Sequence, residues 1–397
     1  MELLQKVKAL ADEFFDDIVY YRRHLHAMPE LSMQEVKTAA FLADRLRESG
    51  IEVTEGVAGT GLTAVIKGRD PDAAMVALRA DMDALPIQEE SRVEYKSSVP
   101  GVMHACGHDA HMAGLLGAGR ILHALRDEWS GSVKLIFQPS EESYPGGASL
   151  MIREGVLDHP KPVAVFGQHV FPGLPAGKVG IRSGMYMAST DEVYLAVKGK
   201  GGHAATPQLN VDPIVIASHI VVALQQIVSR NATPYIPTVL SFGRIAGDGL
   251  MNVIPDEVKI DGTFRTFDEE WRKQAHLRIR EIAVFTAQGM GGDCDVVIEP
   301  GYPSLYNNPK LADSFVRYAG EYAGRDHVEE LELSMTGEDF AHFARHADAC
   351  FYRLGVSNVR EGIVANLHTS KFDIDEEALR TGMGLMAWLA IRRLEEA

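Results

Sequence analysis

The chain has 397 residues, of which 46% are hydrophobic and 24% are charged. These fractions are typical of a globular protein with a sizeable core, and the length is sufficient for two or three domains. The formal net charge of −16 argues against a nucleic-acid partner, because such a protein needs a basic surface.

The N-terminal residues and the cysteines indicate a cellular compartment. Residues 1–17 are expected to form an acidic amphipathic helix, and they lack the basic start and the uninterrupted apolar core of a signal peptide. No apolar run reaches membrane-spanning length. The cysteines, Cys106, Cys294 and Cys350, are far apart and odd in number, which suits a reducing compartment. We therefore expect a cytoplasmic protein with no disulfide framework and no membrane partner.

The first part of the chain predicts a sheet covered by helices on both faces. Residues 1–50 are expected to form two helices, the second over 33–49, with Pro29 breaking the pattern between them. Apolar strands then alternate with helices, which is typical of a mostly parallel sheet that is buried on both sides. Strands are expected over 62–67, 74–79, 132–138 and 163–168, and helices from Asp109 and over 148–154.

The pattern changes after about Gly184. Segments that alternate with period two are separated by long amphipathic helices, in the order strand, helix, strand, strand, helix, strand of the ferredoxin-like split unit. We expect this α+β unit, residues 185–300, to be inserted into an α/β domain made of residues 1–184 and 301–397. Its strands are expected at 191–198, 238–245, 257–267 and 295–299, and its helices at 212–230 and 268–288.

One short segment, M-H-A-C-G-H-D-A-H-M over residues 103–112, concentrates groups that bind metals or move protons. Cys106 and His108 are expected in the tight turn that enters the helix, with both side chains facing one point. Helix N–H groups and a nearby metal would each favour the thiolate form of Cys106. A single cysteine or histidine is usually a structural residue, but this density of His104, Cys106, His108, Asp109 and His111 favours metal binding or catalysis.

Polar side chains also follow three of the expected strands. In open α/β sheets, sites form outside the C-terminal ends of the strands. We therefore expect the following groups to lie at one edge of the sheet, beside the Cys/His turn: Asp81 and Asp83, Glu141 and Glu142, and His169.

The residue types predict a mixed metal site. Thiolate, imidazole and carboxylate ligands together suit Zn²⁺ best, with Mn²⁺, Co²⁺ or Ni²⁺ as further candidates. Five protein ligands exceed what one catalytic zinc uses, so two metals that share a bridging group and acidify one water fit better. The candidate ligands are Cys106, His108, Glu142, His169 and His368. In the pair Glu141–Glu142, one carboxylate would bind metal and the other would act as general base, although such pairs are often only solvated charges.

The inserted unit carries three further candidates. His203 lies in the glycine-rich segment G-K-G-G-H-A-A-T-P, from which it could polarise a scissile carbonyl. Asn252 and Arg265 could hold a substrate carboxylate, because the arginine fork matches that anion. The alternatives are an ordinary surface histidine for His203 and a salt bridge within the unit for Arg265.

Taken together, these motifs resemble the dinuclear metallo-aminoacylase and carboxypeptidase clan, and within it the hippurate hydrolase and indole-acetyl-amino-acid amidohydrolase branch. The resemblance runs from residue 22 to residue 372 and covers nearly the whole chain. The motifs that carry it, in chain order, are R-R-H-L-H-A-M-P-E-L-S, L-R-A-D-M-D-A-L-P, M-H-A-C-G-H-D-A-H, Q-P-S-E-E, H-V, G-G-H-A-A-T-P, N-V-I-P, G-T-F-R, M-T-G-E-D-F and L-H-T-S-K-F.

The resemblance implies a zinc-exopeptidase-like three-layer α/β/α catalytic domain with an inserted ferredoxin-like lid and dimerisation domain. Glu141 matches the general base of the branch, and its five metal ligands match Cys106, His108, Glu142, His169 and His368. Many relatives have a His-x-Asp pair where this chain has Asp81-Met82-Asp83. The branch supplies Cys106 in place of that histidine, and Asp83 is then expected to orient a ligand.

The resemblance also implies an assembly and a reaction. The inserted domain is expected to form a homodimer, or a tetramer, in which His203, Asn252 and Arg265 serve the neighbouring subunit's site. The expected enzyme is an amidohydrolase with two divalent metal ions that cleaves N-acyl amino acids, including acetyl, benzoyl and other aryl-acyl derivatives. The alternatives are a dipeptidase or carboxypeptidase of the same clan, a thiol hydrolase using Cys106 and His108, and a non-catalytic binding protein on the same fold.

Overall fold

The computed structural model describes residues 2–397, which fall into two compact units. The first unit contains Met1–Gly184, Tyr306–Leu333 and Asp339–Ala397, and the second contains Met185–Leu305 and Ser334–Glu338. Residues 301–305 and 334–338 are expected from the sequence in the first unit, whereas in the structure both segments belong to the second. The short strands β7 (Gly184–Met187) and β14 (Leu305–Asn307) lie where the chain passes between the units.

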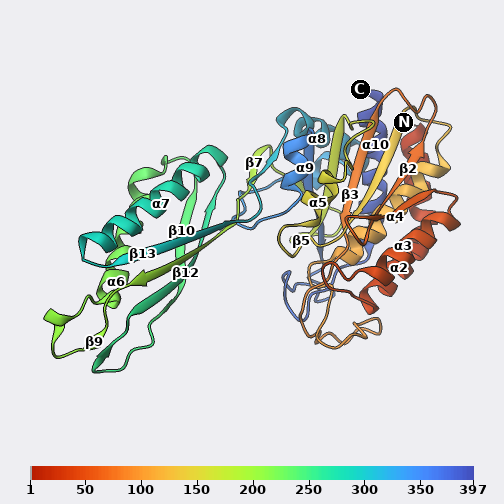
Figure 1. Cartoon of the computed structure of the whole chain (residues 1–397). Helices are drawn as coiled ribbons and strands as arrows, with labels where there is room; N and C mark the ends of the chain where they lie inside the picture. The colour runs from red at the N-terminus through yellow and green to blue at the C-terminus, as the bar shows by residue number, and fades with distance from the viewer. Residues whose placement is uncertain (1) are drawn as a thin grey trace. The chain divides into compact units, whose positions relative to one another are not determined.

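An eight-stranded sheet forms the centre of the first unit (Figure 1), in the order β1-β2-β4-β3-β5-β16-β6-β15. The central strands β4, β3, β5 and β16 run parallel to one another, whereas β1 with β2, β2 with β4, and β16 with β6 pair antiparallel. The sheet is therefore mixed, with a parallel centre. Its strands are β1 (Val53–Val57), β2 (Gly61–Lys67), β3 (Met75–Asp81), β4 (Ser132–Gln138), β5 (Ala164–Pro175), β6 (Val179–Ile181), β15 (Val328–Glu330) and β16 (Ala349–Ser357).

Helices cover this sheet, as the mostly apolar strands β3 and β4 predicted, and every residue of these two strands is buried. Two of them, α4 and α10, pack against each other and against β3. Their close approach depends on Gly117, where a β-carbon would lie 2.7 Å from the Met383 sulfur. The helices of this unit are α1 (Glu2–Glu13), α2 (Phe15–Ala27), α3 (Val36–Glu48), α4 (His108–Ala124), α5 (Gly147–Arg153), α8 (Pro309–Ala323), α9 (Ala341–His346) and α10 (Glu377–Glu395), with a short 3₁₀ turn at Arg325–His327.

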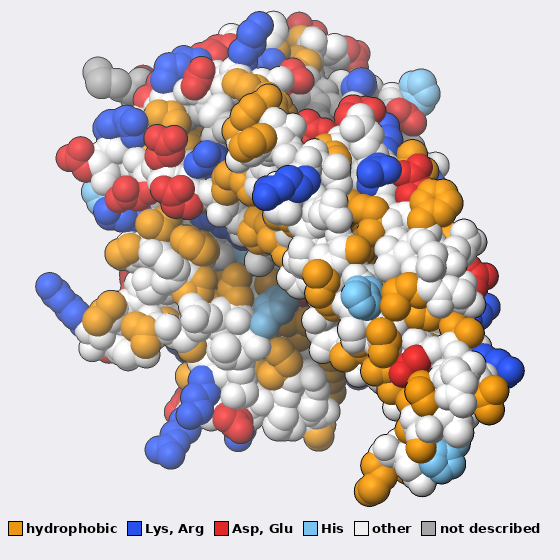
Figure 2. All heavy atoms as spheres, turned by 90° about the vertical axis from the view of Figure 1, so that its left-hand side faces the viewer, with side chains coloured by type: hydrophobic (Ala, Val, Ile, Leu, Met, Phe, Trp, Pro, Cys, Tyr) orange, Lys and Arg blue, Asp and Glu red, His pale blue; other side chains and the backbone are white. Residues whose placement is uncertain are grey.

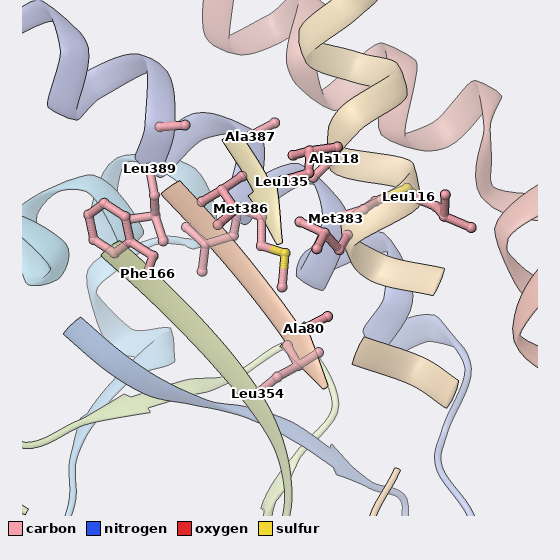
Figure 3. Close-up of a cluster of buried hydrophobic side chains, with 14 of the residues drawn as sticks. Ala80, Leu116, Ala118, Leu135, Phe166, Leu354, Met383, Met386, Ala387 and Leu389 are labelled. Carbon is pink, nitrogen blue, oxygen red and sulfur yellow. The ribbon is translucent and has the colours of Figure 1, made fainter. Parts of the chain in front are cut away.

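The main hydrophobic core of the first unit lies between the sheet and helices α4 and α10 (Figure 3). Met383 of α10 lies beside side chains from four neighbouring strands, all of them buried. These strand residues are Ala80, Leu135, Phe166 and Leu354. The core therefore fixes the positions of α4, which begins at His108, and of β5, which contains His169. Both residues belong to the site described below.

Helix α2 corrects the expectation of only two helices before residue 50. The segment R-R-H-L-H-A, expected as a connection, forms its last turns. The buried face of α2 contains the polar residues Arg22 and His26 beside Ile18 and Leu25, so its helical period is hidden when only apolar residues are counted. His169 is a second difference, because it lies inside β5 rather than after a strand.

The second unit has the ferredoxin-like order that the sequence predicted. Its antiparallel sheet runs β10-β12-β8-β13, and the helices α6 and α7 pack against each other and contribute to its core. The elements are β8 (Asp191–Lys198), α6 (Pro213–Leu224), β10 (Thr238–Ala246), β12 (Glu257–Thr266), α7 (Glu269–Gly289) and β13 (Asp293–Pro300). In a small two-stranded ribbon, β9 (Gly202–His203) pairs with β11 (Val253–Ile254). A 3₁₀ turn, Pro207–Leu209, follows β9 in the chain.

The long helix expected over residues 212–230 ends at Leu224 and continues as a π-helical turn, Ile227–Asn231. By length and composition alone, the segment Pro213–Asn231 is apolar enough to cross a membrane, which the sequence analysis had not expected. In the structure its residues Ile216, Ile220 and Leu224 are buried in the core of the second unit. One face of this helix therefore packs in the core of that unit, and 33% of the segment is buried.

Candidate metal and catalytic site

The turn into α4 determines where Cys106 and His108 point. Gly107 precedes the helix with φ of 84°, a left-handed conformation that favours glycine. A β-carbon at Gly107 would lie 2.4 Å from Cγ2 of Val170. Glycine is thus required here for both its backbone conformation and its size, and this turn buries Cys106 and His108 on either side of it.

The structure brings the five predicted ligands into one cluster in the first unit. The Cys106 sulfur lies 3.4 Å from Nε2 of His169 and 3.3 Å from Nε2 of His368. Oε1 of Glu142 lies 3.2 Å from Nε2 of His368 and 3.9 Å from Nε2 of His108. Two groups of ligand atoms result, each within 4.8 Å: Cys106 with His108 and His169, and Cys106 with Glu142 and His368.

Hydrogen bonds outside the cluster orient its imidazoles. Nδ1 of His108 donates to the carbonyl oxygen of Asp83 at 2.7 Å, and Nδ1 of His169 donates to that of Val170 at 2.7 Å. Each Nε2 is then the lone-pair nitrogen and faces the cluster. Nε2 of His108 and Oε1 of Glu142 are buried, and among residues 2–397 neither forms a hydrogen bond, although Oε1 of Glu142 lies within ion-pair distance of Nε2 of His368 and of His108. Buried polar atoms without hydrogen bonds, beside a sulfur, fit a divalent metal.

The electrostatics of the cluster also favour a cation. Burial raises the pKa of the Cys106 thiol well above its usual value, and the carboxylates of Glu142 and Glu141 raise it further. Burial acts to lower the pKa of His108, but Asp81 and Asp83 outweigh it and raise that pKa to about 10. The carboxylates thus create a negative potential at Nε2 of His108. Without a cation the N–H groups of α4 do not produce the thiolate that the sequence analysis expected, which argues against a thiol nucleophile.

Asp83 holds the other carboxylates in place. Its Oδ1 and Oδ2 accept the main-chain N–H groups of Glu141 and Glu142 at 2.9 and 3.0 Å, respectively. Glu141 is itself 6% exposed, and its Oε1 lies 3.4 Å from the main-chain nitrogen of Asp339. Asp83 was expected to orient a ligand, and in the structure it contacts both the turn that carries Glu142 and the ring of His108.

His111 and Asp81 form a hydrogen-bonded pair beside His108 of the cluster. Nδ1 of His111 donates to Oδ1 of Asp81 at 2.5 Å, and its Nε2 accepts the N–H of Val170 at 2.8 Å. Both ring nitrogens are therefore occupied. Asp81 also accepts a hydrogen bond from Arg79 at 2.8 Å, so its buried carboxylate has a cationic partner.

Asp109 has two buried partners that its sequence motif did not indicate. Oδ2 of Asp109 accepts from Nε of Arg22 at 2.8 Å and lies 2.7 Å from Nδ1 of His26. Both partners are wholly buried residues of α2. The motif R-R-H-L-H-A thus fastens α2 to the first turn of α4, directly beside His108. The spacing of Arg22 and His26, four residues apart, was the only signal in the sequence for this contact.

The three remaining candidates belong to the second unit. His203 and Asn252 are exposed and meet on the β9–β11 ribbon, where the Ala204 N–H donates to the Asn252 carbonyl at 3.0 Å. Arg265 lies on β12, half-buried, and donates to Oγ1 of Thr263 and to the carbonyl of Met335. Among residues 2–397, Arg265 forms no ion pair. The salt bridge considered from the sequence is therefore absent.

Comparisons with known proteins agree with this architecture. The model of peptidase family M20/M25/M40 matches residues 77–392. Thermostable carboxypeptidase 2 of Saccharolobus solfataricus is 40% identical over 99% of each chain. IAA-amino acid hydrolase ILR1-like 4 of Arabidopsis thaliana is 38% identical over 98% of this chain and 88% of its own.

A solved structure with the same fold is that of the YXEP protein of Bacillus subtilis, described as a dinuclear metal binding peptidase from the M20 family. It is 35% identical, with a TM-score of 0.83, and the match covers 97% of this chain and 100% of that one. The resemblance inferred from the sequence motifs is thereby confirmed. The chain belongs to peptidase family M20/M25/M40 and is a metal-binding hydrolase of amide bonds.

Proposed function

We propose that the protein hydrolyses the amide bond of N-acyl amino acids, releasing a carboxylic acid and a free amino acid. The observation that carries this proposal is the pair of ligand groups that share Cys106, with Glu141 buried beside them. Two divalent cations, Mn²⁺ or Zn²⁺ with Co²⁺ or Ni²⁺ as alternatives, fit this mixed set of sulfur, nitrogen and oxygen atoms. One would be held by Cys106, His108 and His169, and the other by Cys106, Glu142 and His368.

The cations, when bound, supply positive charge that polarises a carbonyl and acidifies a water. Glu141 is the general base in this proposal. It takes the proton of the attacking water and returns that proton to the departing amine nitrogen. Its neighbour Glu142 is directed toward Nε2 of His368, so the two adjacent carboxylates have different surroundings and different tasks.

The substrate's free carboxylate is assigned to Arg265, assisted by Asn252. Arg265 is half-buried, has no ion pair among the described residues, and presents a fork that matches a carboxylate. His203, whose Nδ1 accepts the N–H of Ala205 at 3.0 Å, retains Nε2 for polarising the scissile carbonyl.

We further propose that the second unit acts as a lid and forms a homodimer or a tetramer, with these three residues serving the partner's site. Its helices expose the large apolar side chains of Val222, Leu277 and Phe285, and hydrophobic side chains are numerous on the face shown in Figure 2. Such exposure marks interaction surfaces. A cytoplasmic location remains part of the proposal, supported by three free, buried cysteines.

A carboxypeptidase acting on peptides is the second candidate function, because a relative of that name is 40% identical to this chain. A panel of N-acetyl, N-benzoyl and indole-acetyl amino acids, assayed beside dipeptides and longer peptides, separates the two. Each assay is repeated after EDTA treatment and after adding back Mn²⁺, Zn²⁺ or Co²⁺. The proposal expects N-acyl amino acids to have the highest kcat/KM and EDTA to abolish activity. Faster cleavage of peptides would favour the carboxypeptidase, and activity that resists EDTA would exclude the metal site.

A further inference from the structure

The turn that carries Glu141 is held in an unusual conformation. Ser140 has φ of 52°, in the left-handed region that a non-glycine residue rarely adopts. Three consecutive N–H groups of this turn each donate to a buried carboxylate oxygen. Ser140 donates to Oε1 of Glu35 at 2.8 Å, and Glu141 and Glu142 donate to the two oxygens of Asp83. Two carboxylates from distant segments therefore determine the course of this turn.

Glu35 is an unexpected residue to find in this position. Its side chain is wholly buried, and it forms no ion pair with any residue in the range 2–397. Its second oxygen, Oε2, accepts the hydroxyl of Thr60 at 2.6 Å. A buried carboxylate without a cation destabilises a fold unless hydrogen bonds compensate for the lost water. The N–H of Ser140 and the hydroxyl of Thr60 provide that compensation.

Glu35 also does not cap its own helix. It occupies the N-cap position of α3, where a polar side chain normally accepts an N–H of the first turn, but it makes no such bond. Glu30 does so instead, since its Oε2 accepts the N–H of Thr38 at 2.9 Å and the Thr38 hydroxyl at 3.0 Å. The carboxylate of Glu35 is thereby left to bind Ser140.

The same segment contacts the other carboxylate of the turn. The hydroxyl of Ser32 donates to Oδ2 of Asp83 at 2.6 Å. The segment is joined to the chain beyond β3, because the N–H of Ala84 donates to the carbonyl of Glu30 at 2.8 Å. Residues 30–35, E-L-S-M-Q-E, therefore form a clamp on the turn, and this clamp lies outside the cluster of ligand atoms.

We propose that Glu35 is a positioning residue for the general base. Its hydrogen bond to the Ser140 N–H keeps the turn in the left-handed conformation, and that conformation sets the direction in which the side chain of Glu141 leaves the main chain. This inference rests on the proposed role of Glu141. A turn that relaxed toward an ordinary conformation would move the carboxylate, and a displacement of about 1 Å is sufficient to lower a rate about a hundredfold.

The test compares three substitutions of Glu35. Glu35→Gln keeps an oxygen that accepts the Ser140 N–H. Glu35→Met keeps a similar side-chain volume but offers no acceptor. Glu35→Ala loses both the volume and the acceptor. Purified metal-loaded enzyme is assayed for kcat and KM on N-acetyl amino acids, for metal content by mass spectrometry and for its unfolding temperature. We expect Glu35→Met and Glu35→Ala to lower kcat by about tenfold to a hundredfold, with KM and metal content nearly unchanged. Glu35→Gln should retain kcat within about threefold, since its hydrogen bond survives.

Glu154→Ala is the matched control, because it removes one negative charge and one hydrogen bond to a main-chain N–H, that of Ala58 at 2.8 Å, outside residues 30–35. It should lower the unfolding temperature slightly through loss of that hydrogen bond and leave kcat unchanged. The inference is overturned if Glu35→Met and Glu35→Gln have the same kcat, or if kcat falls only in proportion to bound metal. Should Glu35→Ala fail to fold, the comparison of Glu35→Met with Glu35→Gln decides alone. Glu141→Gln is assayed in parallel. If it stays active, the proposed function fails, whereas an inactive Glu141→Gln beside a fully active Glu35→Met overturns only the positioning role.

Discussion

Nε2 of His368 lies 3.2 Å from Oε1 of Glu142 and 3.3 Å from the sulfur of Cys106, from which it is 262 residues distant in sequence. His368 has φ of 59°, and its N–H donates to the carbonyl of Ala105 at 2.8 Å. The C-terminal loop is thus fastened to the turn before α4 by its main chain as well as by its imidazole. This contact closes the group made by Cys106, Glu142 and His368.

Glu141→Gln should keep its bound metals and lose activity by several orders of magnitude. Gln has nearly the same shape as Glu but does not accept the proton of the attacking water, so only the proton transfer is removed. Metal content and kcat/KM of the two proteins are measured on the same preparation. A variant within about tenfold of the wild type, equivalent to about 1.4 kcal/mol, would show that Glu141 is not the base.

Arg265→Ala should raise KM for N-acyl amino acids by about tenfold to a hundredfold and affect kcat less. The guanidinium has no ion pair among the described residues, so its removal leaves no buried carboxylate unpaired. A rise in KM would therefore report lost binding of the substrate carboxylate. The control is a substrate whose α-carboxylate is converted to an amide. If both substrates lose kcat/KM equally, Arg265 does not bind the carboxylate.

Gly107→Ala should destabilise the turn into α4 and weaken metal binding. The new methyl group would meet Cγ2 of Val170 at 2.4 Å, in addition to the strain of a left-handed alanine. Gly101→Ala is the matched control, because Gly101 has φ of 74° and no atom within 4 Å of its β-carbon position. It should cost only about 1–2 kcal/mol. Urea unfolding and metal titration are compared for both variants, and equal effects would contradict a steric requirement at Gly107.

Asp191 should make the stability of the second unit depend on pH. Burial acts to raise the pKa of Asp191, but hydrogen bonds from His276 and Arg272 outweigh it and hold that pKa below its usual value. The folded unit therefore binds fewer protons than the unfolded chain. The stabilisation is present above about pH 4, the ordinary pKa of an aspartate, and is lost as pH falls below it.

Asp191→Asn tests this assignment. It leaves Arg272, whose Nη2 lies 2.5 Å from Asp191, without its buried partner, and should cost about 3 kcal/mol at pH 7. Unfolding by urea is followed at pH 7 and at pH 3 for both proteins. The difference between them should shrink at the lower pH, and a constant difference would mean that Asp191 does not supply the pH dependence.

The sequence alone determined the elements whose apolar residues repeat regularly. Strands β4 and β8 have the predicted bounds, and the second unit has the predicted order, because period-two and helical repeats report directly which face is buried. The chemical types of the candidate ligands, and the family to which the chain belongs, could also be predicted, since thiolate, imidazole and carboxylate side chains have specific uses.

Only the tertiary structure decided the contacts between distant segments. Helix α2 was missed because Arg22 and His26, which face the core, are polar, and their partner Asp109 lies in another helix. Glu35 carries no signal in the sequence, since acidic residues are common at the start of a helix and a single one indicates no distant partner. Its contact with Ser140, 105 residues away, exists because the packed fold brings α3 to the end of β4. Hydrogen bonds of this kind depend on the folded positions of both partners, and local periodicity contains no information about them.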